Sequence, residues 1–315
     1  ENMKICFLTH NLRQDNGAGV FSLYLIRRLK EELGYEVRIL TTVPSDVSFE
    51  RPILYPNRFR LLGQFLRIRR ALKECDVIHA LDVFPYGVLA VFLSLGLDKK
   101  IIITATGSNS ILPLYHWLKF PFVRFAYRKA DVLTAISNFT KEEILKKIPD
   151  LIMRVINHGV DADFFARADG SHYPTARYQP YILSVGQLRW RKGYHFSIRA
   201  FTKVRDRFPD VKYVIVGKRM KDDYYDRLQK LIDELKLRDS VFILEDVDTK
   251  EQLADVYKGA ELFCLFSQNV NHDVEGFGLV FLEAAAAGLP VVGSKNCGVD
   301  DAVREGENGI LVATR

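Results

Sequence analysis

The chain has 315 residues, 48% of them hydrophobic and 27% charged, with a formal charge of +6 and a pI near 9.0. The length suggests two domains that each bury a core, and the basic balance permits nucleotides, nucleic acid or acidic lipid surfaces as partners. No signal peptide is expected, and the uncharged stretch over residues 83–97 is too short for a membrane span. The cysteines show no C-x-x-C spacing, which argues against a zinc site or a disulfide framework and favours a reducing cytoplasm; they are Cys6, Cys75, Cys264 and Cys297.

The first half alternates apolar segments with helical ones. Residues 4–8 are expected to form a strand, residues 20–33 a helix ended by Gly34, and residues 37–40 a second strand. This alternation predicts a parallel, doubly wound sheet, with further strands at residues 77–79, 101–104, 132–135 and 153–156.

Gly17-Ala18-Gly19 lies between the first strand and the first helix. An NAD-binding fingerprint needs its first glycine at the end of the strand, whereas about eight residues intervene here. Glu36 also begins the second strand instead of ending it. Without that fingerprint, the glycines indicate either a ligand-facing loop or a loop that needs a flexible backbone.

Two basic stretches interleave arginine and lysine with apolar and aromatic residues, over residues 58–70 and 117–128. Both could lie on an anionic membrane surface, which would give the N-terminal domain a peripheral membrane contact. The alternative is a pair of amphipathic helices packed on a sheet with solvated arginines.

A second alternation of strands and helices begins at Tyr181. Residues 169–179 are expected to link an N-terminal domain, residues 1–168, to a C-terminal domain, residues 180–315. In open parallel sheets ligands bind at the carboxyl ends of the strands, where Gly186, Gly217 and Glu275 fall. The expected strands are residues 182–185, 211–216, 241–244, 262–266 and 291–292.

The stretch EGFGLVFLEAAAAGLP, residues 275–290, is expected to carry the binding site. Gly276 and Gly278 precede good helix formers over residues 279–287, and Gly288 signals the end of the helix. Backbone N–H groups are unpaired at a helix N-terminus and the dipole is positive there, so a phosphate or diphosphate is the expected ligand.

Two carboxylates bracket that helix N-terminus. Glu275 precedes the helix, and Glu283 lies about five residues into it, roughly 7.5 Å along the axis. They could hold polar groups on either side of a diphosphate. The alternative is that Glu283 is an exposed helix residue and that the alanines pack in the core.

Glu275-x7-Glu283, with its Gly-Phe-Gly and Gly-Leu-Pro-Val-Val continuation, closely resembles the signature of family 4 of the retaining glycosyltransferases. The resemblance implies an α/β GT-B fold, two Rossmann-like domains facing a central cleft, and metal-independent sugar transfer from a nucleotide-sugar. VINHGVDADFF, residues 155–165, resembles the family's Asn-Gly-Val-Asp element, although His158 follows Asn157. Family members continue with further helices, so the C-terminal domain is expected to be incomplete at Arg315.

GQLRWRKG, residues 186–193, resembles the family's Gly-Arg-Leu…Lys-Gly element, in which Lys192 matches the lysine that binds the donor diphosphate. Gln187 stands where the family has arginine, and Arg189 or Arg191 could replace it. Such cations neutralise charge on the departing diphosphate, as a divalent ion does in other transferases. An exposed basic loop is the alternative.

The resemblance also implies a role for each glutamate. Glu275 would face the transferred sugar and act with Lys192 as a catalytic residue, and Glu283 would bond the ribose hydroxyls. Gly217 would line the nucleotide pocket, or it is a turn glycine. The remaining donor-binding positions implied are Gly17 and Gly19 across the cleft, Gly186, Gly276, Phe277, Gly278 and Leu279.

The sequence contains neither the family's histidine nor a convincing metal-binding motif. The family's Thr-x-His-Gly histidine is absent, because Thr106 stands in its place, so no catalytic histidine is expected. In the family the leaving phosphate can itself serve as the base.

Asp161-Ala162-Asp163 and Asp246-Val247-Asp248 match the D-x-D metal motif of other transferases. The first lies in the Asn-Gly-Val-Asp-like element, however, and the second could be an N-cap region. No metal and no cofactor are therefore expected.

These observations predict a cytoplasmic, retaining hexosyltransferase that uses a UDP- or GDP-sugar and acts on a glycan, lipid-linked or small-molecule hydroxyl. Nucleic acid is not an expected partner. The alternatives are a catalytically degenerate GT-B protein that binds nucleotide, and an NAD-dependent Rossmann enzyme.

Overall fold

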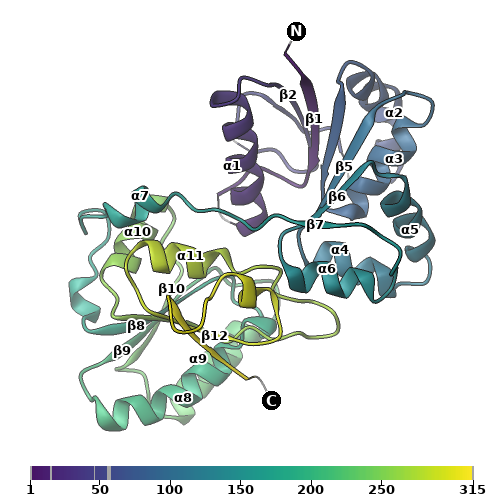
Figure 1. Ribbon diagram of the computed structural model, residues 1–315. Coiled ribbons are helices and arrows are strands. Elements are labelled where there is room, and N and C mark those ends of the chain that lie inside the picture. Colours follow the sequence, from purple (N-terminus) through teal and green to yellow (C-terminus); the bar gives the residue numbers. More distant parts are fainter. Residues whose placement is uncertain (1, 15, 46, 55–57, 314–315) are drawn as a thin grey trace. The chain divides into compact units, whose positions relative to one another are not determined.

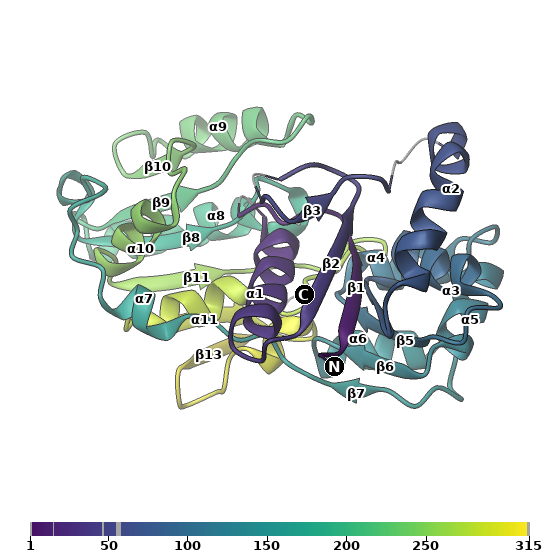
Figure 2. The same ribbon diagram turned by 90° about the horizontal axis from the view of Figure 1, so that it is seen from above.

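The computed structural model describes residues 2–14, 16–45, 47–54 and 58–313, and for residues 58–62 it describes the backbone alone. The chain forms two compact units, unit 1 (Glu1–His158) and unit 2 (Gly159–Arg315) (Figures 1 and 2). Among the described residues no helix is long and apolar enough to cross a membrane.

Unit 1 is built on a seven-stranded parallel sheet with the strand order β3-β2-β1-β4-β5-β6-β7. The predicted parallel sheet is confirmed, and the expected strands lie within about two residues of the observed ones. The strands are β1 (Lys4–Thr9), β2 (Glu36–Thr41), β3 (Glu50–Arg51), β4 (Val77–Leu81), β5 (Lys100–Ala105), β6 (Val132–Ala135) and β7 (Arg154–Val155).

The helices of unit 1 lie in the crossover connections between parallel strands and cover both faces of the sheet. Because the strand order reverses at β1, right-handed crossovers place α1 on one face of the sheet and the later helices on the other. The helices are α1 (Gly17–Glu31), α2 (Arg58–Lys73), α3 (Val88–Ser94), α4 (Ser108–Ile111), α5 (Phe120–Lys129) and α6 (Asn138–Leu145), with short turns η1 (Val83–Gly87) and η2 (Leu112–Tyr115).

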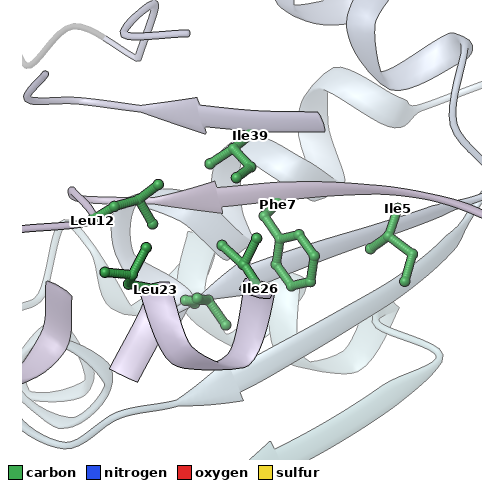
Figure 3. Close-up of a cluster of buried hydrophobic side chains, with 7 residues drawn as sticks. Ile5, Phe7, Leu12, Leu23, Ile26 and Ile39 are labelled. Carbon is green, nitrogen blue, oxygen red and sulfur yellow. The ribbon is translucent and has the colours of Figure 1, made fainter. Parts of the chain in front are cut away.

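One cluster of the unit 1 core lies between β1 and α1 (Figure 3). Alternate β1 residues Ile5 and Phe7 point to α1, which buries Leu23 and Ile26 against them. Ile39 of β2, Leu12 and Leu81 complete the cluster, and burying side chains of this size contributes about 1.5–3 kcal/mol each.

The helix α1 begins at Gly17, three residues before the expected start. Gly17 and Gly19 therefore lie in its first turn, not in a preceding loop. The Asn16 side chain caps the helix by accepting the Gly19 N–H at 2.8 Å. A Cβ atom on Gly19 would stand 2.1 Å from the Arg13 carbonyl oxygen, so close approach requires glycine at this position.

Unit 2 contains a six-stranded parallel sheet with the order β10-β9-β8-β11-β12-β13. Its strands are β8 (Tyr181–Val185), β9 (Lys212–Val216), β10 (Val241–Leu244), β11 (Leu262–Leu265), β12 (Val291–Ser294) and β13 (Gly309–Val312). Its helices are α7 (Ala162–Ala166), α8 (Tyr194–Arg207), α9 (Tyr224–Glu234), α10 (Lys250–Lys258) and α11 (Leu279–Ala286), with short turns η3 (Ala176–Tyr178), η4 (Trp190–Lys192) and η5 (Gly298–Asp301).

The boundary between the units lies at His158 and Gly159, before the linker expected over residues 169–179. That segment packs within unit 2. The buried carboxylate of Asp255 on α10 accepts the backbone N–H groups of Gly170 at 2.9 Å, His172 at 2.5 Å and Tyr173 at 3.0 Å. The glycine and proline residues of this segment therefore lie in turns that pack against unit 2, and they do not form a flexible linker.

Candidate functional site

The sheet of unit 2 reverses its strand order between β8 and β11, and two loops meet at the carboxyl ends of these strands. Gly193 has φ +70°, and a Cβ atom on it would lie 2.1 Å from the Phe266 carbonyl oxygen. The Gln268 N–H donates to the Arg191 carbonyl at 2.6 Å. A topological switch point is where open α/β sheets bind ligands.

The two loops bring two cations onto one carboxylate. Oε2 of Glu275 accepts from Lys192 Nζ at 2.5 Å, from Arg191 Nη1 at 2.9 Å and from Ser267 Oγ at 3.1 Å. Lys192 is only 8% exposed. The alternative of an exposed basic loop is therefore wrong for Lys192.

These contacts determine the charge state of the site. Burial alone would raise the pKa of Glu275, but the adjacent Lys192 and Arg191 outweigh burial and lower it to about 2. Burial opposes the charge on Arg191, yet Glu275 and Asp273 raise its pKa. Asp273 Oδ1 lies 3.3 Å from Arg191 Nε. Burial lowers the pKa of Lys192, and the adjacent Glu275 opposes that shift. At neutral pH Glu275 is thus an ionised carboxylate beside the Arg191 guanidinium.

The helix predicted after Gly278 is confirmed as α11, which ends at Ala286 ahead of Gly288, whose φ is +89°. Gly278 is its N-cap with φ +87°, and a Cβ atom there would stand 2.9 Å from the Phe281 ring. Phe277 is buried and fixes the entry into the helix, where Leu279 is the first residue. The helix N-terminus and its dipole thus follow closely after Glu275 in the chain.

Glu283 is a buried residue of α11, so the alternative of an exposed helix glutamate is wrong. It is 8% exposed, and its Oε2 accepts the Tyr257 hydroxyl at 2.9 Å. Burial raises its pKa, although the Tyr257 hydrogen bond and the more distant Lys250 and Lys192 oppose the shift. A buried carboxylate with an unfavourable charge is well suited to accept hydroxyl donors from a ligand.

A cavity of about 400 Å³ opens beside Arg191. Trp190 lines it and stacks on His195, with ring centroids 4.3 Å apart and planes 26° apart. Arg189 also lines it, and its buried Nε has no hydrogen-bond partner in the part of the chain that the structure describes. The other lining residues are Met220, Lys221, Asp222, Val270 and Asp273.

Several of these residues were not predicted from the sequence. Ser267 and Asp273 belong to no motif and reach the site only because the loops after β8 and β11 fold together. Trp190 lies within the GQLRWRKG element, but no role was predicted for it. The only sequence signal for these residues was their place in loops that follow strands.

The remaining predicted glycines have visible packing roles. A Cβ atom on Gly217, after β9, would stand 2.0 Å from the Gly186 carbonyl oxygen, so Gly217 lets two strand ends approach. Gly186 has φ +148° and lies against Lys192 and Tyr194. The Gly276 carbonyl would stand 2.1 Å from a Cβ atom on Gly298. Gly17 and Gly19 belong to unit 1, and their predicted contact with donor phosphates stays a prediction.

The D-x-D carboxylates make local contacts. Asp161 caps α7 by accepting the Phe164 N–H at 3.1 Å, and Asp163 pairs with Arg167 at 3.7 Å. Asp246 accepts the Tyr173 hydroxyl at 2.9 Å, while Asp248 pairs with Lys218 at 2.5 Å.

Asp169, His172 and Asp255 form the one acid-histidine cluster found among the described residues. Because Asp255 already accepts three backbone N–H groups, this cluster fits a structural tie better than a metal centre.

In unit 1, Thr106 follows β5 and donates its backbone N–H to the buried Asp82 at 3.2 Å. His10 Nδ1 lies 3.0 Å from the Tyr86 hydroxyl. His79 is half-buried, and its Nε2 lies 2.7 Å from Thr104 Oγ1.

Two family models together match nearly the whole chain: "Glycosyltransferase Family 4" over residues 15–164 and "Glycosyl transferases group 1" over residues 173–315. The chain is 28% identical over 287 residues to a GDP-mannose-dependent alpha-(1-6)-phosphatidylinositol monomannoside mannosyltransferase of Mycolicibacterium smegmatis, covering 85% of this chain and 69% of the relative. It is 23% identical over 322 residues to an N-acetyl-alpha-D-glucosaminyl L-malate synthase of Bacillus anthracis, covering 94% and 80%.

Solved structures share the architecture. HepE of Anabaena, in complex with UDP and glucose, matches with a TM-score of 0.79 and 20% identity, covering 99% of this chain and 86% of that one. Sucrose-phosphate synthase of Thermosynechococcus elongatus matches with a TM-score of 0.75 and 23% identity, with the same coverage. With two parallel α/β units and matches to both halves, the chain belongs to glycosyltransferase family 4 and has the GT-B fold.

Proposed function

We propose that this chain is a retaining, metal-independent hexosyltransferase that takes a sugar from a UDP- or GDP-sugar. The observation that carries the proposal is the convergence of Lys192 and Arg191 on Glu275, shortly before the N-terminus of α11. Two nearly buried cations and a helix dipole are suited to a diphosphate leaving group, whose charge grows as the sugar departs.

Arg191 supplies the cation that the family element has at Gln187. Arg191 contacts the same carboxylate oxygen as Lys192, and its Nε faces Asp273. Arg189 lines the neighbouring cavity, where it can bind the sugar or the acceptor. The planar guanidinium binds phosphate oxygens in pairs, which a lysine cannot do.

The other site residues divide between the nucleoside and the sugar. Glu283 accepts the ribose hydroxyls from its buried position on α11, and Glu275 bonds the hydroxyls of the transferred sugar. The backbone of residues 276–279 holds the diphosphate, with Gly186, Gly217 and the unit 1 glycines Gly17 and Gly19 in supporting contacts.

Transfer breaks the bond between the anomeric carbon and the diphosphate oxygen and forms a bond to the acceptor oxygen on the same face. The acceptor proton passes to the leaving diphosphate, which acts as the base. This route requires no protein base and is compatible with Thr106 at the position of the family histidine. Lys192 and Arg191 stabilise the separating charge, as a metal does elsewhere.

The mycobacterial relative indicates which class of donor to test first. The mycobacterial relative is a GDP-mannose-dependent mannosyltransferase of phosphatidylinositol monomannoside. We therefore infer a GDP- or UDP-hexose donor and a glycan, lipid-linked or small hydroxyl acceptor, in polysaccharide or glycolipid synthesis. The four free, buried cysteines support a cytoplasmic enzyme.

A second candidate is a GT-B protein that binds nucleotide without catalysis, which Gln187 and Thr106 favour. Incubation with GDP-mannose, UDP-glucose and related donors, followed by detection of released GDP or UDP, separates the two. Slow donor hydrolysis, or transfer with retained anomeric configuration by NMR, supports the enzyme. Nucleotide binding without release of GDP or UDP from any donor or acceptor tested supports the second candidate.

A further inference from the structure

One side of unit 1 presents large apolar side chains to solvent. In α5 and the turn before it, Trp117 is 80% exposed, Leu118 53% and Phe122 51%. Phe92 of α3 lies against Phe122, with ring centroids 6.0 Å apart, and α3 and α5 are neighbours (Figure 1). We call Phe92, Trp117, Leu118 and Phe122 the apolar patch. Four neighbouring exposed side chains of this size are unusual for a surface that faces only water.

The stretch that carries the patch contains cations and no acids. Between Asp98 and Asp131 the sequence has six basic residues and not one aspartate or glutamate. The formal charge of the whole chain is also +6, so the rest of the chain is neutral on balance. The six are Lys99, Lys100, Lys119, Arg124, Arg128 and Lys129.

Several of these cations lie along aromatic surface. Lys119 Nζ is 4.7 Å from the centroid of the Phe84 ring, and Lys129 Nζ is 5.9 Å from that of Phe125. Arg124 is exposed on α5. Arg128 pairs with Asp150 at 2.7 Å, but an exposed pair of this kind contributes little and leaves the surrounding field basic. Lys100 likewise pairs with Asp131 at 2.9 Å. Lys119, Arg124 and Lys129 thus lie in the same helix and preceding turn as Trp117, Leu118 and Phe122 of the apolar patch.

The neighbouring helix α2 has the same character. Residues 51–73 contain seven arginines and lysines and no acid. The helix packs against α3, and Arg69 Nη1 donates to the Leu93 carbonyl at 2.8 Å. The helix α2 therefore lies beside α3 and exposes Arg67, Arg70 and Lys73.

We propose that the apolar patch and its bordering cations bind the surface of an anionic lipid bilayer. An exposed tryptophan beside leucine and phenylalanine is suited to the level of the headgroups, and the lysines and arginines are suited to lipid phosphates. Nucleic acid would use the cations but would leave the apolar side chains in water. The inference concerns where unit 1 is held, and it does not depend on the reaction.

Vesicle binding tests the proposal. The chain is mixed with vesicles of phosphatidylcholine alone, or of phosphatidylcholine with phosphatidylglycerol, at low and high salt, and bound protein is recovered by flotation. Binding is expected only with the anionic lipid, and salt weakens it. Phe122→Glu lowers the partition coefficient about tenfold or more, because it removes an inserting ring and adds a negative charge.

The matched control is Phe208→Glu in unit 2, where the ring is 56% exposed and the charge change is the same. It is expected to leave binding within about twofold. Arg124→Glu, which removes no apolar group, is expected to weaken binding several-fold. Circular dichroism checks that each variant is folded.

Tryptophan fluorescence locates the contact, because the chain has two tryptophans, Trp117 and Trp190. In Trp190→Phe the emission is expected to shift to the blue on anionic vesicles, and in Trp117→Phe it is expected to stay in place. The proposal is overturned by absence of binding to anionic vesicles, by equal losses in Phe122→Glu and Phe208→Glu, or by an unshifted Trp117. A dimer that Phe122→Glu dissociates, without vesicle binding, would instead assign the patch to a second copy of the chain.

Discussion

Lys192 Nζ lies 2.5 Å from Glu275 Oε2, and both side chains are nearly buried at the switch point of the unit 2 sheet. Burying a charged lysine is unfavourable unless an anion pairs with it. Glu275 pairs with Lys192 and also with Arg191, so one carboxylate faces two cations. A bound diphosphate would offer the same cations a stronger anion and release the carboxylate toward the sugar.

That exchange predicts opposite effects on binding and turnover in Glu275→Gln. Sugar transfer should fall about 100-fold or more, because the amide bonds the sugar poorly as charge develops. The dissociation constant for GDP should be unchanged or lower, since Lys192 loses its competing carboxylate. Glu261→Gln, on an exposed residue, is the matched control for calorimetry and kinetics. Loss of GDP binding together with activity would contradict the exchange.

The buried carboxyl group of Glu283 predicts that its replacement stabilises the protein by an amount that depends on pH. Burial raises its pKa above the value in the unfolded chain, so its contribution is most favourable at low pH and is lost as the pH rises through the folded-state value. Glu283→Gln should therefore raise the melting temperature of the free protein more at pH 8 than at pH 5. The same variant should weaken nucleoside diphosphate binding. A gain that is equal at both pH values would show that Glu283 is not an uncompensated buried charge.

Close approach of the two site loops predicts unequal costs for two glycines with positive φ. Gly193→Ala should lower the free energy of unfolding by about 3 kcal/mol or more, because its Cβ atom would overlap the Phe266 carbonyl. Gly288→Ala has the same backbone strain but open space around the new methyl group, so it should cost about 1–2 kcal/mol. Urea titrations followed by circular dichroism compare them. Equal costs would mean that strain alone explains both.

Chelation should leave the protein unchanged. EDTA is expected to alter neither the melting temperature nor donor hydrolysis, since Asp255 is occupied by backbone N–H groups and the D-x-D acids are engaged locally. Asp255→Ala should destabilise the protein by several kcal/mol, because three buried donors lose their acceptor. An EDTA-sensitive melting temperature restored by a divalent ion would instead reveal a metal centre at Asp169, His172 and Asp255.

The sequence predicted the alternating architecture because buried parallel strands contain short continuous apolar runs, such as ICFL at residues 5–8 and III at residues 101–103. It also predicted α11, because a run of helix-forming residues lies there between glycines. It placed the start of α1 wrongly, because Gly17 and Gly19 look like a turn until the close contact with Arg13 is known. The contacts of Ser267 and Asp273 arise from tertiary structure, which carries no local signal.

Calorimetric titration of GDP and UDP into wild type, Lys192→Ala and Lys203→Ala tests the central claim most directly. Lys203 is an exposed residue of α8 and carries the same charge change. Binding should weaken at least about tenfold in Lys192→Ala and in Arg191→Ala, and by no more than about threefold in Lys203→Ala and Arg189→Ala. Dissociation constants for both nucleotides that are unchanged in Lys192→Ala would contradict the proposed diphosphate site.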